Sequence, residues 1–343
     1  MQQAATETIR YLFDKAQANG AIREVVPGLH WLRLPLPFVL NHVNVWLLED
    51  QGRWTIVDTG ADRPETRAIW DTALAGRSVD RLIGTHGHPD HIGLAGWLVE
   101  KLNIPLSMTL GEWLAPQVWR EEGLKPMRAE VEAFWRSAGV AEAALSDMKS
   151  ARANAPFRNY PLPPNFERLR DGEPIRFGGR AWQVLVNGGH ADEHASFYCS
   201  AEKILIAGDQ VLSKISPVVG VFASQPKADP LADYLASLKR LATLPADTLV
   251  LPSHGLPFFG LHTRLQELEA HHHTRLDQLV GHMTAPMTAV ALASRLFVKA
   301  TADGHNVLAT AETLAHAHRL VGEGRARQHR DGDGRVTFTG AER

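Results

Sequence analysis

Short apolar runs alternate with helical patterns along the first part of the chain. Turn residues bound three runs that are rich in Val, Ile, Leu and Trp, a pattern that predicts strands at Leu29–Leu34, His42–Leu48 and Trp54–Val57. Residues 64–75 have a helical pattern, Val79–Thr85 predicts another strand, and Ile92–Leu102 predicts the next helix. Strands that alternate with helices indicate an α/β domain.

A long segment at residues 111–165 departs from this alternation. It is mostly helical in pattern and carries three tryptophans, Trp113, Trp119 and Trp135. Strand patterns return between residues 173 and 208. We therefore predict one main α/β domain over residues 1–281, with a helical insertion at about 111–165.

The chain changes character again beyond residue 281. Two helical stretches are followed by two short extended pieces around the sequence DGDG at residues 331–334. Helices followed by a small hairpin predict a winged-helix-like domain over residues 282–343. Several arginines in this domain could contact phosphates, but we favour a structural role or a homodimer contact over binding of nucleic acid.

Composition and charge narrow the function classes. With 44% hydrophobic residues, 22% charged residues and a net charge of −2, the chain is typical of a globular protein and offers no strong field for nucleic acid or an acidic membrane. The N-terminus does not resemble a secretory signal, and no apolar run approaches the roughly 18 residues of a membrane span. We expect a cytoplasmic protein without a membrane segment.

Histidine and cysteine usage directs the search for chemistry. The chain has 17 histidines and one cysteine, Cys199, which excludes an intrachain disulfide and Cys-rich zinc sites. Neutral imidazole is the commonest protein ligand for metals, so clusters of histidine deserve a search. The run HHH at residues 271–273 falls on a predicted helix, where its side chains would face different directions. We therefore interpret it as a solvated or packed helix face.

The main cluster is His86-x-His88-x-Asp90-His91, which lies between a predicted strand and a predicted helix. Alternate side chains of an extended segment point the same way, so His86 and His88 can bind one ion together. The turn that follows can bring Asp90 and His91 to a neighbouring position. Imidazole and carboxylate groups suit zinc, and also iron or manganese.

Three later residues follow predicted strands. His190 comes after WQVLV, Asp209 after KILIA and His254 after TLVLP. Each lies at the C-terminal end of its strand, where a loop can reach a shared site. His194 comes four residues after His190, and we predict that it packs or supports the ligands rather than binding metal.

The order HxHxDH, GH, GD and SHG resembles the motifs of the metallo-β-lactamase superfamily, in its glyoxalase-II-like branch. The resemblance covers about residues 25–280. It implies an α/β fold, a four-layer αββα sandwich with metals at one edge of two sheets, followed here by a small winged-helix-like module. It also implies seven metal ligands: His86, His88 and His190 for a first ion, Asp90, His91 and His254 for a second, and Asp209 as the bridge. Because the bridging position is Asp, a lactamase that relies on a Cys ligand is disfavoured.

Such a site predicts a dinuclear metal-dependent hydrolase with two divalent ions, zinc for preference and iron or manganese as alternatives. A hydroxide that bridges the two ions would attack a carbonyl or phosphoryl centre. Asp90 is the catalytic candidate, because a metal-bound carboxylate can orient the nucleophile and pass a proton to the leaving group. Asp58, in IVDTG, is predicted to hydrogen-bond the loop of ligands, with a simple turn cap as the alternative.

The favoured substrate is a small molecule: a thioester, an ester or a lactone. The insertion could cover the metals, and Trp113, Trp119 and Trp135 are candidates for an apolar pocket, although they could instead form helix core. Two other functions stay open, a metal-dependent ribonuclease or phosphodiesterase and a non-catalytic metal-binding sensor. The complete ligand set disfavours the sensor.

Overall fold

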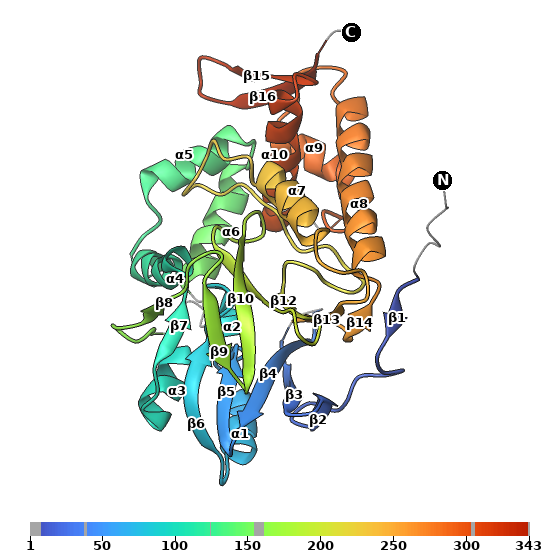
Figure 1. The fold of residues 1–343 in the computed structure, drawn as a ribbon. Helices are drawn as coiled ribbons and strands as arrows, with labels where there is room; N and C mark the ends of the chain where they lie inside the picture. Colours follow the sequence, from blue (N-terminus) through green and yellow to red (C-terminus); the bar gives the residue numbers. More distant parts are fainter. Residues whose placement is uncertain (1–7, 38–39, 124, 154–160, 303–305, 342–343) are drawn as a thin grey trace, which may run out of the picture. The chain divides into compact units, whose positions relative to one another are not determined.

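The computed structural model describes residues 8–37, 40–123, 125–153, 161–302 and 306–341 (Figure 1). The chain forms two compact units. The first unit contains residues 1–121, 156–217 and 242–265, and the second contains residues 122–155, 218–241 and 266–343. The second unit thus takes up most of the predicted insertion, of which residues 124 and 154–160 lie outside the described part. The predicted domain boundary at residue 281 stays a prediction.

Two mixed sheets of seven strands form the body of the first unit. In the first sheet, β2 to β5 are antiparallel to their neighbours, while β6, β7 and β8 add in parallel. Its strands, in spatial order, are β2 (Ile22–Val26), β3 (Leu29–Pro35), β4 (His42–Asp50), β5 (Arg53–Val57), β6 (Ser78–Ile83), β7 (Leu106–Met108) and β8 (Glu167–Arg168).

The second sheet is antiparallel except where β12 pairs with β13. Its strands, in spatial order, are β1 (Arg10–Tyr11), β14 (Phe258–Phe259), β13 (Leu249–Pro252), β12 (Ile204–Gly208), β11 (His194–Cys199), β10 (Arg180–Asn187) and β9 (Pro174–Phe177). Parallel neighbours end at the same edge of a sheet, so β12 and β13 deliver the residues that follow them to one place.

The two sheets pack face to face. On β4, Trp46 and Leu48 belong to the apolar core between the sheets, together with Phe197 and Ile206 of the second sheet. The alternate residues of β4 belong to another core, in which the first sheet packs against α1 (Pro64–Ala73) and α3 (Ala95–Leu102). Both faces of β4 are therefore buried, which explains why its sequence is an almost unbroken apolar run.

The second unit is mainly helical and has its own core. Trp135, Val140, Leu145 and Ala311 form an apolar cluster in it. Its elements are α5 (Ala129–Ser137), α6 (Glu142–Ala153), α7 (Pro230–Leu241), most of α8 (Leu261–His282), α9 (Ala289–Leu296), α10 (Val307–Gly322), β15 (Ala326–Arg330) and β16 (Val336–Gly340). The expected order of two helices and a hairpin is present at the C-terminal end, while its assignment as a winged helix stays a prediction. In the described part of the chain, no helix is both long and apolar enough to cross a membrane.

Candidate metal centre

The ends of five strands of the first unit deliver the candidate residues to one place. Each residue lies one to three positions beyond its strand: Asp58 after β5, His86 after β6, His190 after β10, Asp209 after β12 and His254 after β13. The short helix α2 (Pro89–Ile92) then carries Asp90 and His91. The sequence therefore positions the site simply by ending strands from both sheets at a common edge.

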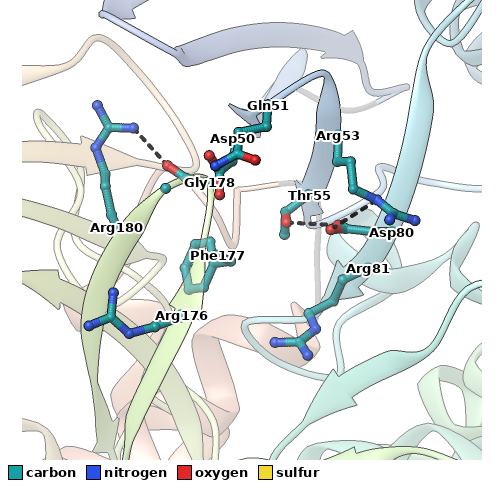
Figure 2. A pocket seen from close by; sticks show the side chains of 11 residues that line it. Asp50, Gln51, Arg53, Thr55, Asp80, Arg81, Arg176, Phe177, Gly178 and Arg180 are labelled. Atoms are coloured by element: carbon teal, nitrogen blue, oxygen red, sulfur yellow. Dashed lines mark hydrogen bonds and ion pairs between the residues drawn. The ribbon is translucent and has the colours of Figure 1, made fainter.

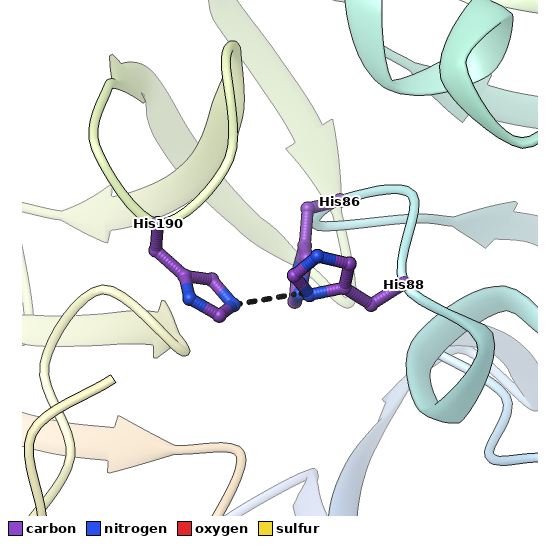
Figure 3. A group of neighbouring side chains, drawn as sticks. All are labelled: His86, His88 and His190. Atoms are coloured by element: carbon purple, nitrogen blue, oxygen red, sulfur yellow. Dashed lines mark hydrogen bonds between the residues drawn. The ribbon is translucent and has the colours of Figure 1, made fainter. Parts of the chain in front are cut away.

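The structure brings all seven predicted ligands together. They form three overlapping groups, and within each group one ligand atom per residue lies within 4.8 Å of the others: His86, His88 and His190; His86, His91 and Asp209; and Asp90, His91 and His254. Figure 3 shows the first group, with the His86 and His190 rings directed toward each other from separate loops. Shared members make the three groups one continuous cluster.

Distances in the first group fit a tetrahedral ion. His86 Nε2 lies 2.9 Å from His88 Nδ1 and 3.3 Å from His190 Nε2. Two ligands about 2.1 Å from a tetrahedral zinc ion would lie roughly 3.4 Å apart, so these nitrogens are spaced as ligands of one ion would be.

Asp209 lies between the first and last groups. Its Oδ2 is 3.5 Å from His190 Nε2, while its Oδ1 is 3.5 Å from His91 Nε2 and 3.4 Å from His254 Nε2. The two carboxylate oxygens thus face two different sets of histidines. This is the arrangement that a carboxylate shared by two ions requires.

Three buried atoms of this cluster have no hydrogen-bond partner within the described residues: His91 Nε2, His254 Nε2 and Asp209 Oδ1. A buried polar atom without a partner costs about 1–3 kcal/mol, so three in one place call for an unseen partner. Nitrogen lone pairs and a carboxylate oxygen all accept, and a cation satisfies all of them at once. The residues present therefore fit a metal centre.

The electrostatics of the cluster point the same way. Burial lowers the pKa of His86 well below its ordinary value and that of His88 to about 3, so both rings are neutral, as ligands must be. Burial also opposes a proton on His91, but the carboxylates of Asp209, Asp90 and Asp58 outweigh it and raise the pKa of His91 well above its ordinary value. These carboxylates thus favour a positive charge at His91, which is the electrostatic setting that a metal cation requires.

Asp58 fixes the loop of ligands from behind. The residue is 1% exposed and adopts φ of 63°. Its Oδ1 accepts a hydrogen bond of 2.8 Å from the Thr85 amide, and its Oδ2 accepts one of 2.8 Å from the Thr85 hydroxyl and lies 2.9 Å from His91 Nδ1. A carboxylate at Nδ1 places the ring proton there and leaves His91 Nε2 free for an ion.

His194 supports Asp209 through the backbone. The Asp209 amide donates to His194 Nε2 over 3.1 Å, and His194 is fully buried. A Cβ on Gly208 would lie 2.3 Å from that same nitrogen, and Gly208 has φ of +57°. The glycine before Asp209 is therefore required for the close approach of the two strands.

Two nearby residues were missed from the sequence. The His42 carbonyl lies 2.7 Å from His254 Nδ1, and His42 Nε2 accepts from the Gly255 amide over 3.0 Å. Glu112, on α4 (Leu110–Gly123), is 2% exposed and accepts a hydrogen bond from the amide of Gly87, which lies between His86 and His88. Neither residue belongs to a sequence motif or has the spacing of a metal ligand, and the fold alone brings each of them to the site.

The three tryptophans lie in different surroundings. The Trp119 ring stacks beside the His88 ring, with 6.0 Å between centroids. Trp113 instead stacks on Phe166 and packs against the core of the first sheet, and Trp135 is buried in the apolar cluster of the second unit. Of the three, Trp119 is therefore placed at the candidate metal centre, while a substrate contact by any of them stays a prediction.

A cavity of about 360 Å³ lies elsewhere in the first unit (Figure 2). The turns between β4 and β5 and between β9 and β10 line it, together with the beginning of β6. The five residues of β5 span about 16 Å, so the cavity and the metal-ligating residues lie at opposite ends of the strands. Three of its arginines are already paired with carboxylates: Arg53 with Asp80, Arg81 with Glu167 and Arg180 with Glu202.

Known proteins resemble the chain along almost its whole length. The family model described as Metallo-beta-lactamase superfamily matches residues 39–254, and that described as Metallo-beta-lactamase-like, C-terminal domain matches residues 276–341. A crystal structure of a beta-lactamase domain protein from Burkholderia ambifaria is 36% identical and covers 97% of this chain and 99% of that one, with a TM-score of 0.82.

Two curated relatives are more distant. The protein named Probable metallo-hydrolase YqjP, from Bacillus subtilis, is 26% identical over 85% of this chain and 92% of its own length. A hydroxyacylglutathione hydrolase from Albidiferax ferrireducens is 25% identical over 64% of this chain and 65% of its own length.

Proposed function

The chain belongs to the metallo-beta-lactamase superfamily, and from this we propose that it hydrolyses a small acyl compound, a thioester, ester or lactone, with two divalent metal ions. The family match confirms the predicted αββα fold. Together with the cluster of candidate ligands, it identifies the chain as a metal-dependent hydrolase. Zinc as the resident ion stays a prediction.

The position of Asp209 is the observation that carries the dinuclear part of the proposal. One of its oxygens faces His190, and the other faces His91 and His254. In this proposal, His86, His88 and His190 would hold one ion, Asp90, His91 and His254 would hold the other, and Asp209 would serve both.

The residues divide the chemical work. When bound, two such ions lower the pKa of a water molecule toward 7 and polarise the carbonyl that it attacks. The Asp90 side chain is 20% exposed, against 9% for Asp209, and its Oδ2 lies 3.6 Å from both His91 Nε2 and His254 Nε2. We assign Asp90 the role of a proton shuttle: its carboxylate would accept the proton that the attacking water loses and would then donate it to the leaving group, since Asp90 is the more exposed of the two carboxylates.

Two observations favour an acyl substrate. Trp119 is half-buried beside His88 and offers a flat apolar surface next to the reacting centre, as ligand pockets commonly do. The relative named hydroxyacylglutathione hydrolase carries in its name the hydrolysis of an acyl–glutathione bond.

The test is a substrate panel with controlled metal content. The protein is stripped with a chelator, reloaded with zinc, manganese or iron, and offered acyl-glutathione and acyl-CoA thioesters, a lactone, a phosphodiester and RNA. We expect turnover of an acyl compound that disappears on stripping and returns on reloading with about two ions per chain. Cleavage of the phosphodiester or RNA alone would replace the acyl proposal with the nuclease alternative.

A further inference from the structure

One face of α4 lies against the loop that carries the first ligands. Glu112, Pro116 and Trp119 are spaced four and three residues apart, so they share a face of the helix. Glu112 Oε2 accepts a hydrogen bond of 2.7 Å from the amide of Gly87, which lies between His86 and His88. Trp119 stacks beside His88. A Cβ on Gly87 would lie 3.0 Å from the Glu112 carbonyl oxygen and from Pro116 Cγ, so a larger residue would push α4 away by a few tenths of an ångström.

The other oxygen of Glu112 reaches a different loop. Its Oε1 accepts a hydrogen bond of 2.9 Å from the amide of Glu193, three residues after His190. The contact is reciprocal, because Glu193 Oε2 accepts one of 2.8 Å from the Gly111 amide at the start of α4. The Thr109 hydroxyl also donates to the Glu193 carbonyl over 2.8 Å. Glu112 and Glu193 thus lock the first turn of α4 to the loop of His190.

Because Glu112 is buried, its carboxylate depends on these two hydrogen bonds. Glu112 is 2% exposed, and a buried carboxylate is unfavourable unless its oxygens are paired. Both oxygens accept from backbone amides, and the two amides belong to segments that are more than 100 residues apart in the chain. An apolar side chain in the same place would leave the buried Gly87 N–H without this acceptor, at a cost of about 1–3 kcal/mol, and would remove the acceptor of the partly buried Glu193 N–H as well.

We propose that Glu112 is a positioning residue that sets the spacing between His86 and His88 on one loop and His190 on the other. This inference rests on the proposed function, because the spacing matters only if these histidines bind one ion. Outer partners of metal ligands typically change metal affinity 10–100-fold when they are removed. Glu112 would act on the ligands through the backbone of both loops, and it belongs to none of the groups of potential metal ligands among the described residues.

The test measures metal binding rather than turnover. Glu112→Gln keeps one acceptor oxygen but turns an NH₂ group toward an amide donor. The matched control is Glu130→Gln, because Glu130 is an exposed glutamate in the first turn of a helix of the second unit. Competition with a chromophoric chelator gives the two zinc dissociation constants, and the visible bands of the cobalt-loaded protein report the ligand geometry.

We expect Glu112→Gln to weaken one zinc site by tenfold or more, to change the other site by less than threefold, and to alter the cobalt bands, while Glu130→Gln matches the wild type. If Glu112→Gln does not fold, Glu193→Ala decides, since it removes the reciprocal bond and should alter the same site. A folded variant with wild-type affinities and bands would overturn the proposal. If the wild type binds two ions and the variant behaves in the same way, only the positioning role of Glu112 is rejected. If the wild type binds no ion, the proposed function is rejected as well.

Discussion

Each unit contains a cluster of buried histidines, but among the described residues the cluster of the first unit alone brings three or more potential metal ligands together. In the first unit, the Nε2 atoms of His91 and His254 lack a hydrogen-bond partner among the described residues and face the carboxylates of Asp90 and Asp209. In the second unit, His272 Nδ1 of α8 lies 3.2 Å from His316 Nε2 of α10, and His316 Nδ1 lies 2.8 Å from the Glu312 carbonyl oxygen. Every group of three or more potential ligand atoms among the described residues lies in the first unit.

The comparison teaches that placement matters more than histidine content. Strand ends that meet at one edge bring side chains together from five separate segments. A helix instead spreads neighbouring side chains around its axis, so His271 is half-buried, His272 is buried and His273 is exposed. His272 and His316 therefore contact each other and the backbone. His272 Nε2 also lacks a hydrogen-bond partner among the described residues, but it belongs to no group of three potential metal ligands there.

The largest expected effect is that of Asp209→Ala. Removing the carboxylate between the two sets of histidines should lose one ion and lower kcat/KM on the order of 1,000-fold, about 4 kcal/mol. The matched variant in the other cluster is His272→Gln, which should keep two ions per chain. Elemental analysis and turnover of both proteins check the prediction, and loss of an ion from His272→Gln would break the comparison.

The cluster of the second unit, formed by His272, His316 and Glu312, should instead make the stability of the protein depend on pH. Burial raises the pKa of Glu312 to about 7, and Arg275 only partly opposes it. The folded state therefore holds a proton that the unfolded state has lost between about pH 4.5 and 7, and stability falls as the pH rises through that window, by about 3 kcal/mol in all. Glu312→Gln should remove this loss and be more stable than the wild type at pH 8.

Histidines of the same cluster act in the opposite direction, which determines how the measurement is made. Burial lowers the pKa of His272 to about 3 and that of His316 to about 4, so each favours unfolding as the pH falls below about 6.5. The quantity to follow is thus the difference in unfolding free energy between Glu312→Gln and the wild type. A difference that does not change between pH 5 and 8 would contradict the buried carboxyl.

A smaller effect is expected for Asp58→Asn. Asparagine tolerates the positive φ of this position, so the backbone should survive, but its NH₂ would face His91 Nδ1. Metal affinity should fall about 10–100-fold, or roughly 1.4–2.7 kcal/mol, as for other partners of ligands. Asp71→Asn, on the exposed surface of α1, is the control, and chelator competition is the measurement. Equal metal affinities in the two variants would show that Asp58 only caps the turn and does not support the ligands.

The sequence predicted the seven candidate ligands that the structure brings together, and it also predicted Asp58 and His194 beside them, but it missed other residues around the centre. Each ligand follows a strand or opens α2, so a strand pattern and a spacing locate it. Glu112 and His42 act through amides and carbonyls of distant loops, and no local pattern records such contacts. The tryptophans were ambiguous for the same reason, because helical spacing does not reveal whether a ring packs on Phe166, joins a helical core or lies beside His88.

An aromatic ring lies beside a histidine in each cluster. Replacing these two rings tests the comparison through the smallest of the expected effects. Trp119 is half-buried and stacks on His88, whereas Tyr234 is fully buried and meets His272 edge-on at 5.3 Å. Trp119→Ala should lower kcat/KM for an acyl substrate about tenfold, or about 1.4 kcal/mol, with two ions retained. Tyr234→Leu should lower stability and leave kcat/KM unchanged, because Tyr234 belongs to the second unit, whereas every group of candidate metal ligands among the described residues belongs to the first. If Trp119→Ala keeps its metals and hydrolyses every substrate like the wild type, then α4 only braces the ligand loop, and the acyl proposal loses its structural support.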